Sequence, residues 1–208
     1  MSAPTPGPDE APTPSHRQVT FTQRVLDWQP WLETVDEIAA TTEQLAVVDA
    51  ITTARQGRAY WATLAHDPGS LRARMALYGN ILSGEGEGRG PRADRELAAT
   101  ATSRVTSCVY CASVHSRAYS ALVKERETVQ RLLDDGPEAD LPPRERAIVD
   151  YATTLALHPD ALGPADLQPL RELGLTDLEL LDITNAAAIF ANANRLMATL
   201  GEARAPDR

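Results

Sequence analysis

Apolar side chains recur every three or four residues along most of the chain, which is the spacing of one face of an α-helix. One such stripe comprises Leu71, Met75, Tyr78 and Leu82. No segment shows the alternation of β-branched and polar residues that is typical of a half-buried strand. The pattern predicts an all-α protein, a single-domain bundle of about seven to nine helices.

Local chemistry fixes several helix boundaries. Asp67 can accept hydrogen bonds from the free N–H groups of a helix that begins with Pro68. Pro143 can begin another helix. Residues 176–179, Thr-Asp-Leu-Glu, fit a capping box before a long apolar segment that we expect to run to Gly201.

Two segments are rich in proline or glycine. The first fourteen residues contain five prolines among small residues, a composition that cannot bury enough surface to order itself. We therefore expect residues 1–18 to form a disordered tail and residues 19–208 to form the helical domain. Residues 84–91 contain four glycines and a proline, so we expect a mobile, exposed loop that leads into a helix from about Asp94.

The chain is acidic, with 20 Lys and Arg residues against 29 Asp and Glu residues and a formal net charge of −9. This charge opposes binding to nucleic acid or to an anionic membrane surface. No apolar run approaches the roughly 20 residues that cross a bilayer, and the N-terminus lacks the basic start and apolar stretch of a signal peptide. We expect a soluble, cytoplasmic protein without nucleic-acid or membrane partners.

The chain has only two cysteines, and they lie three positions apart, with a histidine four positions further on. A helix turns about 100° per residue, so Cys108, Cys111 and His115 would lie within roughly 60° of arc on one face. Two cysteines in a chain of this length do not make a disulfide framework. A close cysteine pair in a reducing compartment more often serves redox chemistry or binds a metal.

The residues around the pair favour thiol chemistry. Ser107 is well placed as an N-cap, which would put both cysteines in a first turn whose free N–H groups favour a thiolate. The spacing also allows a disulfide between Cys108 and Cys111. His115 can exchange protons near neutral pH, and Glu96 could face it if two antiparallel helices carry them. Proximity to the helix end favours Cys108 as the more acidic thiol, whereas proximity to His115 favours Cys111.

Two other interpretations of these residues stay open. Zinc could be held by Cys108, Cys111 and His115 with Glu96 as a fourth ligand, but a structural site usually has four Cys or His ligands and there is no second cysteine pair. The cysteines could also be inert core residues. We expect no metal and no cofactor.

The other conspicuous side chains have simpler structural interpretations. We expect three tryptophans in the core or a subunit interface, two histidines at helix ends, and a polar group on the last helix that ties helices together. These residues are Trp28, Trp31, Trp61, His66, His158, Asn192, Asn194 and Arg195.

Glu96, placed twelve positions before Cys108-Val109-Tyr110-Cys111, together with His115, resembles the motif of the alkylhydroperoxidase D and carboxymuconolactone decarboxylase superfamily. The flanking stretches 64–68, 71–73 and 194–201 resemble its peroxidase-related branch. The resemblance covers about residues 20–201. It implies an all-α subunit that assembles into homotrimers or hexamers.

The resemblance also implies an activity and the roles of four residues. Cys111 would attack a hydroperoxide and become a sulfenic acid, Cys108 would close the disulfide, and Glu96 with His115 would relay protons. An external thiol or a reductase protein would then reduce the disulfide. The sequence departs from the founding members at Tyr110, where they carry a histidine between the cysteines. An unperturbed phenol titrates near pH 10 and is a poor base at neutral pH, so this departure bears on the peroxidase rate.

Other functions compete with a thiol peroxidase. A thiol-disulfide oxidoreductase or electron-transfer adaptor would use the same cysteine pair. Relatives that resemble carboxymuconolactone decarboxylase use acid-base chemistry and lack the reactive pair, so the intact pair argues against that reaction. A non-enzymatic scaffold would tolerate replacement of both cysteines.

Overall fold

The computed structural model describes residues 20–36, 38–51, 57–84 and 86–206. The expected tail, residues 1–18, lies outside the described residues. Within them are nine α-helices, three short 3-10 helices (136–138, 159–161 and 164–167) and one pair of short strands. The elements are β1 (Asp27–Pro30), α1 (Thr42–Ile51), α2 (Arg58–Leu64), α3 (Pro68–Ser83), α4 (Arg92–Val105), α5 (Val109–Val123), α6 (Glu127–Asp135), α7 (Pro143–Leu157), α8 (Gln168–Glu172), α9 (Asp177–Leu200) and β2 (Gly201–Arg204). The predicted all-α class is confirmed.

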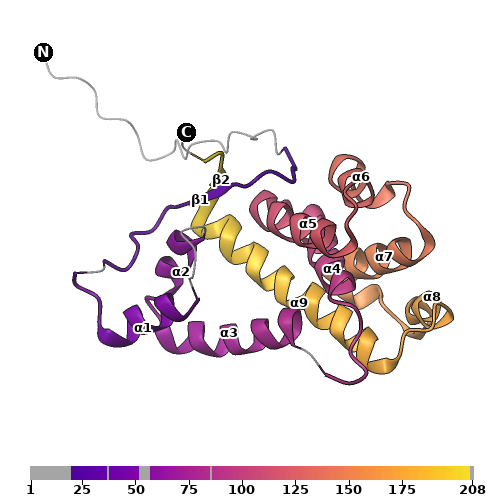
Figure 1. Ribbon diagram of the computed structural model, residues 1–208, viewed down its shortest axis with the longest axis horizontal. Helices are drawn as coiled ribbons and strands as arrows, with labels where there is room; N and C mark the ends of the chain where they lie inside the picture. The colour runs from indigo at the N-terminus through magenta and orange to yellow at the C-terminus, as the bar shows by residue number, and fades with distance from the viewer. Residues whose placement is uncertain (1–19, 37, 52–56, 85, 207–208) are drawn as a thin grey trace, which may run out of the picture.

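Helix α4 is the central helix of the bundle and packs against α5, α7 and α9 (Figure 1). Every residue from Asp94 to Ser103 is buried. Three of these residues, Ala98, Ala99 and Ala101, have no exposed surface, and their small side chains let the neighbouring helices approach closely. Because α4 is buried on all sides, its charged residue Glu96 also lies inside the protein.

The predicted caps are present. The Asp67 side chain accepts a hydrogen bond from the Ser70 N–H at the start of α3, and Thr176 forms the capping box of α9 with Glu179. Helix α4 begins at Arg92, slightly before the start near Asp94 that the sequence predicted. Helix α9 ends at Leu200, one residue before the predicted end.

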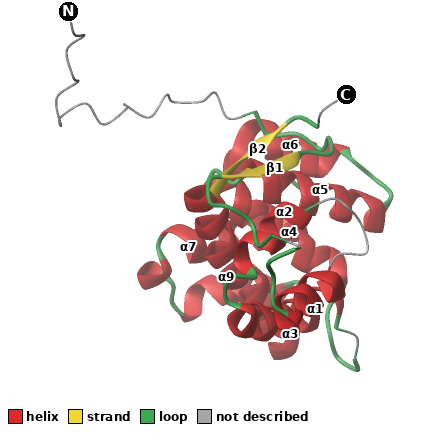
Figure 2. Cartoon of the chain, turned by 90° about the vertical axis from the view of Figure 1, so that its left-hand side faces the viewer, coloured by secondary structure: helices red, strands yellow, loops and turns green. Residues whose placement is uncertain are grey.

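Strands β1 and β2 pair in antiparallel register and lie over one end of the bundle (Figure 2). Their sequences, Asp-Trp-Gln-Pro and Gly-Glu-Ala-Arg, carry no β-branched alternation, so the periodicity analysis missed them. Trp28 is buried and its indole N–H donates to the Met197 carbonyl at 3.3 Å. The strand pair therefore fastens the start of the described chain to the end of α9.

The glycine-rich segment 84–91 is exposed at residues 86–88, as predicted, while residue 85 lies outside the described residues. Arg89 ties the segment to two helices. Its guanidinium pairs with the buried Asp182 of α9 and donates to the Asn80 carbonyl of α3 at 2.8 Å. Arg95 also binds Asp182, at 3.3 Å. The segment is thus anchored at Arg89, just before α4 begins.

Candidate active site

The two cysteines lie at the start of α5. Cys108 is itself the N-cap residue, so the prediction that Ser107 caps the helix is wrong. Ser107 has a left-handed backbone with a φ of 60°. This conformation reverses the chain between α4 and α5, and it leaves Cys108 as the residue that precedes the first turn. The Cys108 N–H is bound to the Ser103 carbonyl at 2.9 Å, which ties the turn to the end of α4.

Both cysteines are buried free thiols, and each shifts the pKa of the other. The Cys111 thiol donates a hydrogen bond to the Cys108 sulfur, and this bond together with the N–H groups of Cys111 and Tyr110 outweighs burial and lowers the pKa of Cys108. The same hydrogen bond and burial raise the pKa of Cys111 well above its usual value. The first proton lost from the pair therefore leaves a thiolate on Cys108.

Glu96 and His115 form a buried pair between α4 and α5. Glu96 Oε2 lies 2.6 Å from His115 Nδ1, and Arg92 Nε donates to Glu96 Oε1 at 3.0 Å. Burial alone would raise the pKa of Glu96, but the hydrogen bonds and charges of His115 and Arg92 outweigh it and hold the pKa below its usual value. The ionised carboxylate can only accept, so the shared proton belongs to His115 Nδ1, and Nε2 is the nitrogen left to exchange protons.

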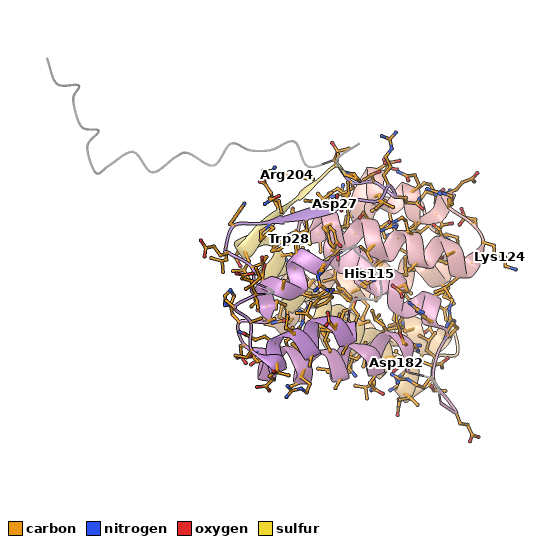
Figure 3. All side chains as sticks on the ribbon, turned by 60° about the vertical axis from the view of Figure 1, so that its left-hand side comes forward. Asp27, Trp28, His115, Lys124, Asp182 and Arg204 are labelled. Atoms are coloured by element: carbon orange, nitrogen blue, oxygen red, sulfur yellow. The ribbon has the colours of Figure 1, made fainter. Side chains whose placement is uncertain are left out.

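A cavity of about 250 Å³ adjoins this pair. Cys111 and His115 are on its wall, whereas Cys108 and Glu96 are not. Figure 3 shows His115 well inside the bundle, far from the surface residue Lys124. The other residues of the wall are Gly57, Tyr60, Trp61, Arg74, Tyr78, Tyr110, Val114, Phe190, Ala193 and Met197.

Side chains from α9 and α5 set the environment of the reactive atoms. The Met197 sulfur lies 3.2 Å from the Cys111 sulfur, and the Phe190 ring packs edge-on to His115 with 4.0 Å between ring centroids. Tyr110 is largely buried, which raises its pKa to about 12. The phenol between the cysteines therefore stays protonated at neutral pH and can only donate a proton in a hydrogen bond or serve as a weak acceptor.

Sequence reasoning brought four residues to this site and missed several others. The structure places Cys108, Cys111, His115 and Glu96 together. Arg92 was missed although its position, four residues before Glu96 on one helix, is a detectable signal. The cavity residues from α2, α3 and α9 carry no such signal, because only tertiary packing brings these helices to α5.

The other side chains that drew attention in the sequence have structural contacts. Asn194 binds the hydroxyl groups of Thr106 at 2.8 Å and Ser103 at 3.3 Å, and so ties α9 to the end of α4. Trp28 is buried, but Trp31 is 60% exposed and Trp61 is on the cavity wall. Within the described ranges, no three His, Cys, Asp or Glu side chains are grouped to hold a metal ion. None of the described helices is long and apolar enough to cross a membrane.

Comparison with solved structures finds the same fold. A peroxidase-related protein with an alkylhydroperoxidase AhpD core from Ralstonia eutropha JMP134 has 28% sequence identity and a TM-score of 0.68, over 81% of this chain and 88% of that chain. A peroxidase-related protein from Silicibacter sp. TM1040 has 24% identity and a TM-score of 0.66, over 85% and 95%. The debrominase Bmp8, in a cysteine-to-alanine variant complexed with 2,3,4-tribromopyrrole, shares the fold at 17% identity and a TM-score of 0.63, over 82% and 91%.

Comparison by sequence matches a shorter part of the chain than comparison by structure. Among curated protein sequences, no significant match to the chain is found. The sequence model of the carboxymuconolactone decarboxylase family matches residues 68–136, which run from the start of α3 through α6 and include both cysteines, Glu96 and His115. The family match over residues 68–136 and the shared architecture together support a relationship of the chain to the alkylhydroperoxidase D and carboxymuconolactone decarboxylase superfamily.

Proposed function

We propose that the protein is a thiol-dependent peroxidase that reduces organic hydroperoxides at Cys111. One observation carries the proposal: Cys111 and His115 share the wall of a cavity large enough for an organic molecule, and Cys108 lies next to Cys111 but outside the cavity wall. A substrate in the cavity meets one sulfur, and the second sulfur is ready behind it. The peroxidase-related relative from Ralstonia eutropha supports the same class of reaction.

The reaction takes place in two steps. As the Cys111 sulfur attacks the terminal peroxide oxygen, its proton passes to His115 Nε2, the O–O bond breaks, and the alkoxide that leaves takes this proton from Nε2 to become an alcohol. Cys111 is then a sulfenic acid. The Cys108 thiolate attacks the sulfenic sulfur, the S–S bond forms, and the hydroxide that leaves takes a proton from solvent to become water. Two thiols and one hydroperoxide thus yield one disulfide, one alcohol and one water.

The pKa directions of the two cysteines fit these two roles. The lowered pKa belongs to Cys108, which has to be a thiolate in order to resolve the sulfenic acid. Cys111 holds its proton until attack, and its place on the cavity wall makes it the sulfur that substrate can reach. His115, with its Nδ1 proton fixed by Glu96, accepts the Cys111 proton at Nε2 and passes it to the departing alkoxide.

The catalytic cycle closes when a dithiol reduces the disulfide and releases two thiols. Both cysteines are only 5% exposed, so the reductant is a small dithiol or a reductase that inserts a narrow segment. A reducing compartment such as the cytoplasm supplies both kinds of reductant. Assembly of several copies of this chain into a trimer or hexamer belongs to the same proposal.

A second candidate is a thiol-disulfide adaptor that passes electrons to a partner and reacts slowly with peroxide. The protonated Tyr110 in place of a second histidine favours it, because one base fewer is present at the cysteines. The burial of both sulfurs limits it to partners that insert a narrow segment, whereas a small hydroperoxide reaches Cys111 through the cavity.

Rapid mixing of the reduced protein with one equivalent of cumene hydroperoxide tests the proposal. We expect fast loss of two thiols, one equivalent of alcohol, and a Cys108–Cys111 disulfide in the peptide masses. Cys111→Ser should abolish the reaction, and Cys108→Ser should stop at a sulfenic acid that a dimedone probe traps. Slow reaction with peroxide but fast exchange with a dithiol protein would favour the adaptor. Full activity in Cys111→Ser would refute the mechanism and leave an acid-base enzyme or a scaffold.

A further inference from the structure

The cavity beside Cys111 is built mainly from rings. Its volume of about 250 Å³ exceeds the roughly 150 Å³ of an engineered protein cavity that binds benzene. Much of the wall is aromatic, from Tyr60, Trp61, Tyr78, Tyr110 and Phe190. Such a wall binds the flat or branched apolar body of an organic molecule and gains little from hydrogen peroxide, which is small and polar.

One side chain in this apolar wall is a permanent cation. Arg74, on α3, donates from one Nη atom to the Tyr60 hydroxyl at 2.9 Å. Its guanidinium carbon lies 5.5 Å from the centroid of the Tyr60 ring and 5.6 Å from that of Trp61. These contacts orient the guanidinium plane beside the cavity without neutralising its charge.

Arg74 differs from Arg89 and Arg95, whose guanidinium groups are both paired with the buried Asp182. Across the described ranges, no carboxylate forms an ion pair with Arg74, and its buried Nε has no hydrogen-bond partner. A buried donor of this kind lowers the stability of the protein unless a ligand satisfies it.

The tyrosine hydroxyls of the wall do not offer a counter-charge. Burial raises the pKa of Tyr60 to about 12, and burial likewise raises the pKa of Tyr78. Both phenols are therefore neutral at physiological pH. Arg74 is the one Lys, Arg, Asp or Glu side chain among the described residues that line the cavity.

We propose that the cavity takes an organic hydroperoxide that carries a carboxylate, with the carboxylate on Arg74 and the peroxide at Cys111. This inference rests on the proposed function for the peroxide end, and on Arg74 alone for the acid end. A guanidinium presents paired N–H groups that match a carboxylate, and the apolar wall strengthens the attraction. The aromatic rings hold the body of the molecule between the two ends.

Matched substrates and matched variants test the acid end. The substrates are cumene hydroperoxide and its analogue with a carboxylate on the para position of the ring, which share the same reacting group. Arg74→Met removes the charge from the cavity. Arg72→Met removes the same charge from the exposed face of the same helix, where Arg72 pairs with the exposed Glu43. Circular dichroism checks that both variants fold, and Arg74→Lys keeps a charge without the guanidinium geometry.

We expect the wild-type protein to react about tenfold to a hundredfold faster with the carboxylated substrate at low concentration, the range given by one charged hydrogen-bonded contact. Arg74→Met should lose this preference, Arg74→Lys should keep part of it, and Arg72→Met should keep all of it. Equal rates for the two substrates in the wild-type protein would overturn the proposal. An equal slowing with both substrates in Arg74→Met would also overturn it, because Arg74 would then act on the thiols.

A binding measurement separates this proposal from the peroxidase proposal. 4-Isopropylbenzoate has the same shape and charge but no peroxide, so it can bind but cannot oxidise a thiol. We expect calorimetric binding to the reduced wild-type protein and to Arg72→Met, and at least tenfold weaker binding to Arg74→Met. If binding follows this order while no hydroperoxide reacts, the carboxylate site stands and the peroxidase assignment fails. If hydroperoxides react but the benzoate binds Arg74→Met as tightly as wild type, the carboxylate site is wrong.

Discussion

His115 Nδ1 lies 2.6 Å from Glu96 Oε2, and the contact joins two helices at a point where both side chains are almost fully buried. Because the carboxylate fixes the proton on Nδ1, the pair determines which nitrogen of His115 meets the cavity. An interaction between residues nineteen positions apart thus sets the tautomer of His115.

Glu96→Gln is expected to slow peroxide-dependent thiol loss by about tenfold to a hundredfold. The amide can present its N–H to His115 and so favour the other tautomer, with the proton on Nε2. Stopped-flow thiol titration measures the rate, and nitrogen-15 shifts of labelled imidazole report the tautomer. The control is Glu43→Gln, which changes the same groups at an exposed pair. An unchanged rate together with a switched tautomer would show that His115 takes no part in proton transfer.

Glu96 also predicts a pH dependence of stability. Its pKa in the folded protein lies below the usual 4.5. The ionised carboxylate therefore contributes stability above about pH 4.5, and that contribution is lost as the pH falls through the lowered pKa. We expect the difference in unfolding free energy between wild type and Glu96→Gln to shrink as the pH is lowered from 6 to 3, in urea titrations at each pH. A difference that grows on acidification would contradict the lowered pKa.

The cysteine pair gives a separate prediction for thiol acidity. Cys111→Ala removes the thiol that donates to Cys108, so the pKa of Cys108 should rise. Cys108→Ala removes the sulfur that holds the Cys111 proton, so the pKa of Cys111 should fall, although burial still keeps it above the usual value. Thiolate absorbance near 240 nm against pH measures both. A Cys108 pKa that stays low in Cys111→Ala would mean that the helix N–H groups alone sustain the thiolate.

The buried charges at the start of α4 predict a large loss of stability. Asp182→Ala leaves Arg95, which is 4% exposed, without its carboxylate. Removing one partner of a buried pair costs about 3–5 kcal/mol. Glu43→Ala breaks the Arg72 pair, in which both side chains are more than half exposed, and should cost at most about 1 kcal/mol. Denaturant unfolding compares the two, and equal losses would show that Asp182 is not needed to compensate Arg95.

Two glycines predict changes of opposite sign. A Cβ on Gly201 would collide with the Trp28 ring and the Gln29 carbonyl, so Gly201→Ala should lose about 1–3 kcal/mol of stability. A Cβ on Gly79, inside α3, would meet nothing within 4 Å, so Gly79→Ala should gain about 0.5–1 kcal/mol. Thermal unfolding checks the sign of each. Trp28 fluorescence should change only in Gly201→Ala.

The sequence predicted the parts of this protein that depend on local chemistry. The caps at Asp67 and Thr176 are formed by residues within a few positions of the helix start, so spacing alone finds them. Glu96 was expected to face His115 if the chain turned near residues 105–107 and the two helices packed antiparallel, and the structure has this reversal between α4 and α5. Ser107 was assigned wrongly as a cap because its left-handed backbone is set by the reversal itself, not by its side chain.

The rest of the site depends on packing between distant helices. Arg74 and Phe190 carry no local signal, since an arginine or a phenylalanine on a helix is ordinary in any sequence. They become part of the site only because α3 and α9 both pack near α5. The short strands were missed for a similar reason: β1 and β2 pair with each other across the whole chain, and neither segment favours a strand by itself.

That pairing has a consequence for the order in which the protein folds. Trp28 and Met197 are 169 residues apart, so their contact closes a loop that spans nearly the whole chain and gains nothing until the helices between them have assembled. The strand pair should form last and open first. The centroids of the Trp28 and Tyr60 rings are 5.2 Å apart, and Tyr60 lines the cavity. Opening the strands therefore also loosens one wall of the cavity. Native-state hydrogen exchange would then show the β1 amides exchanging long before those of α4, and substrate entry would share that opening motion.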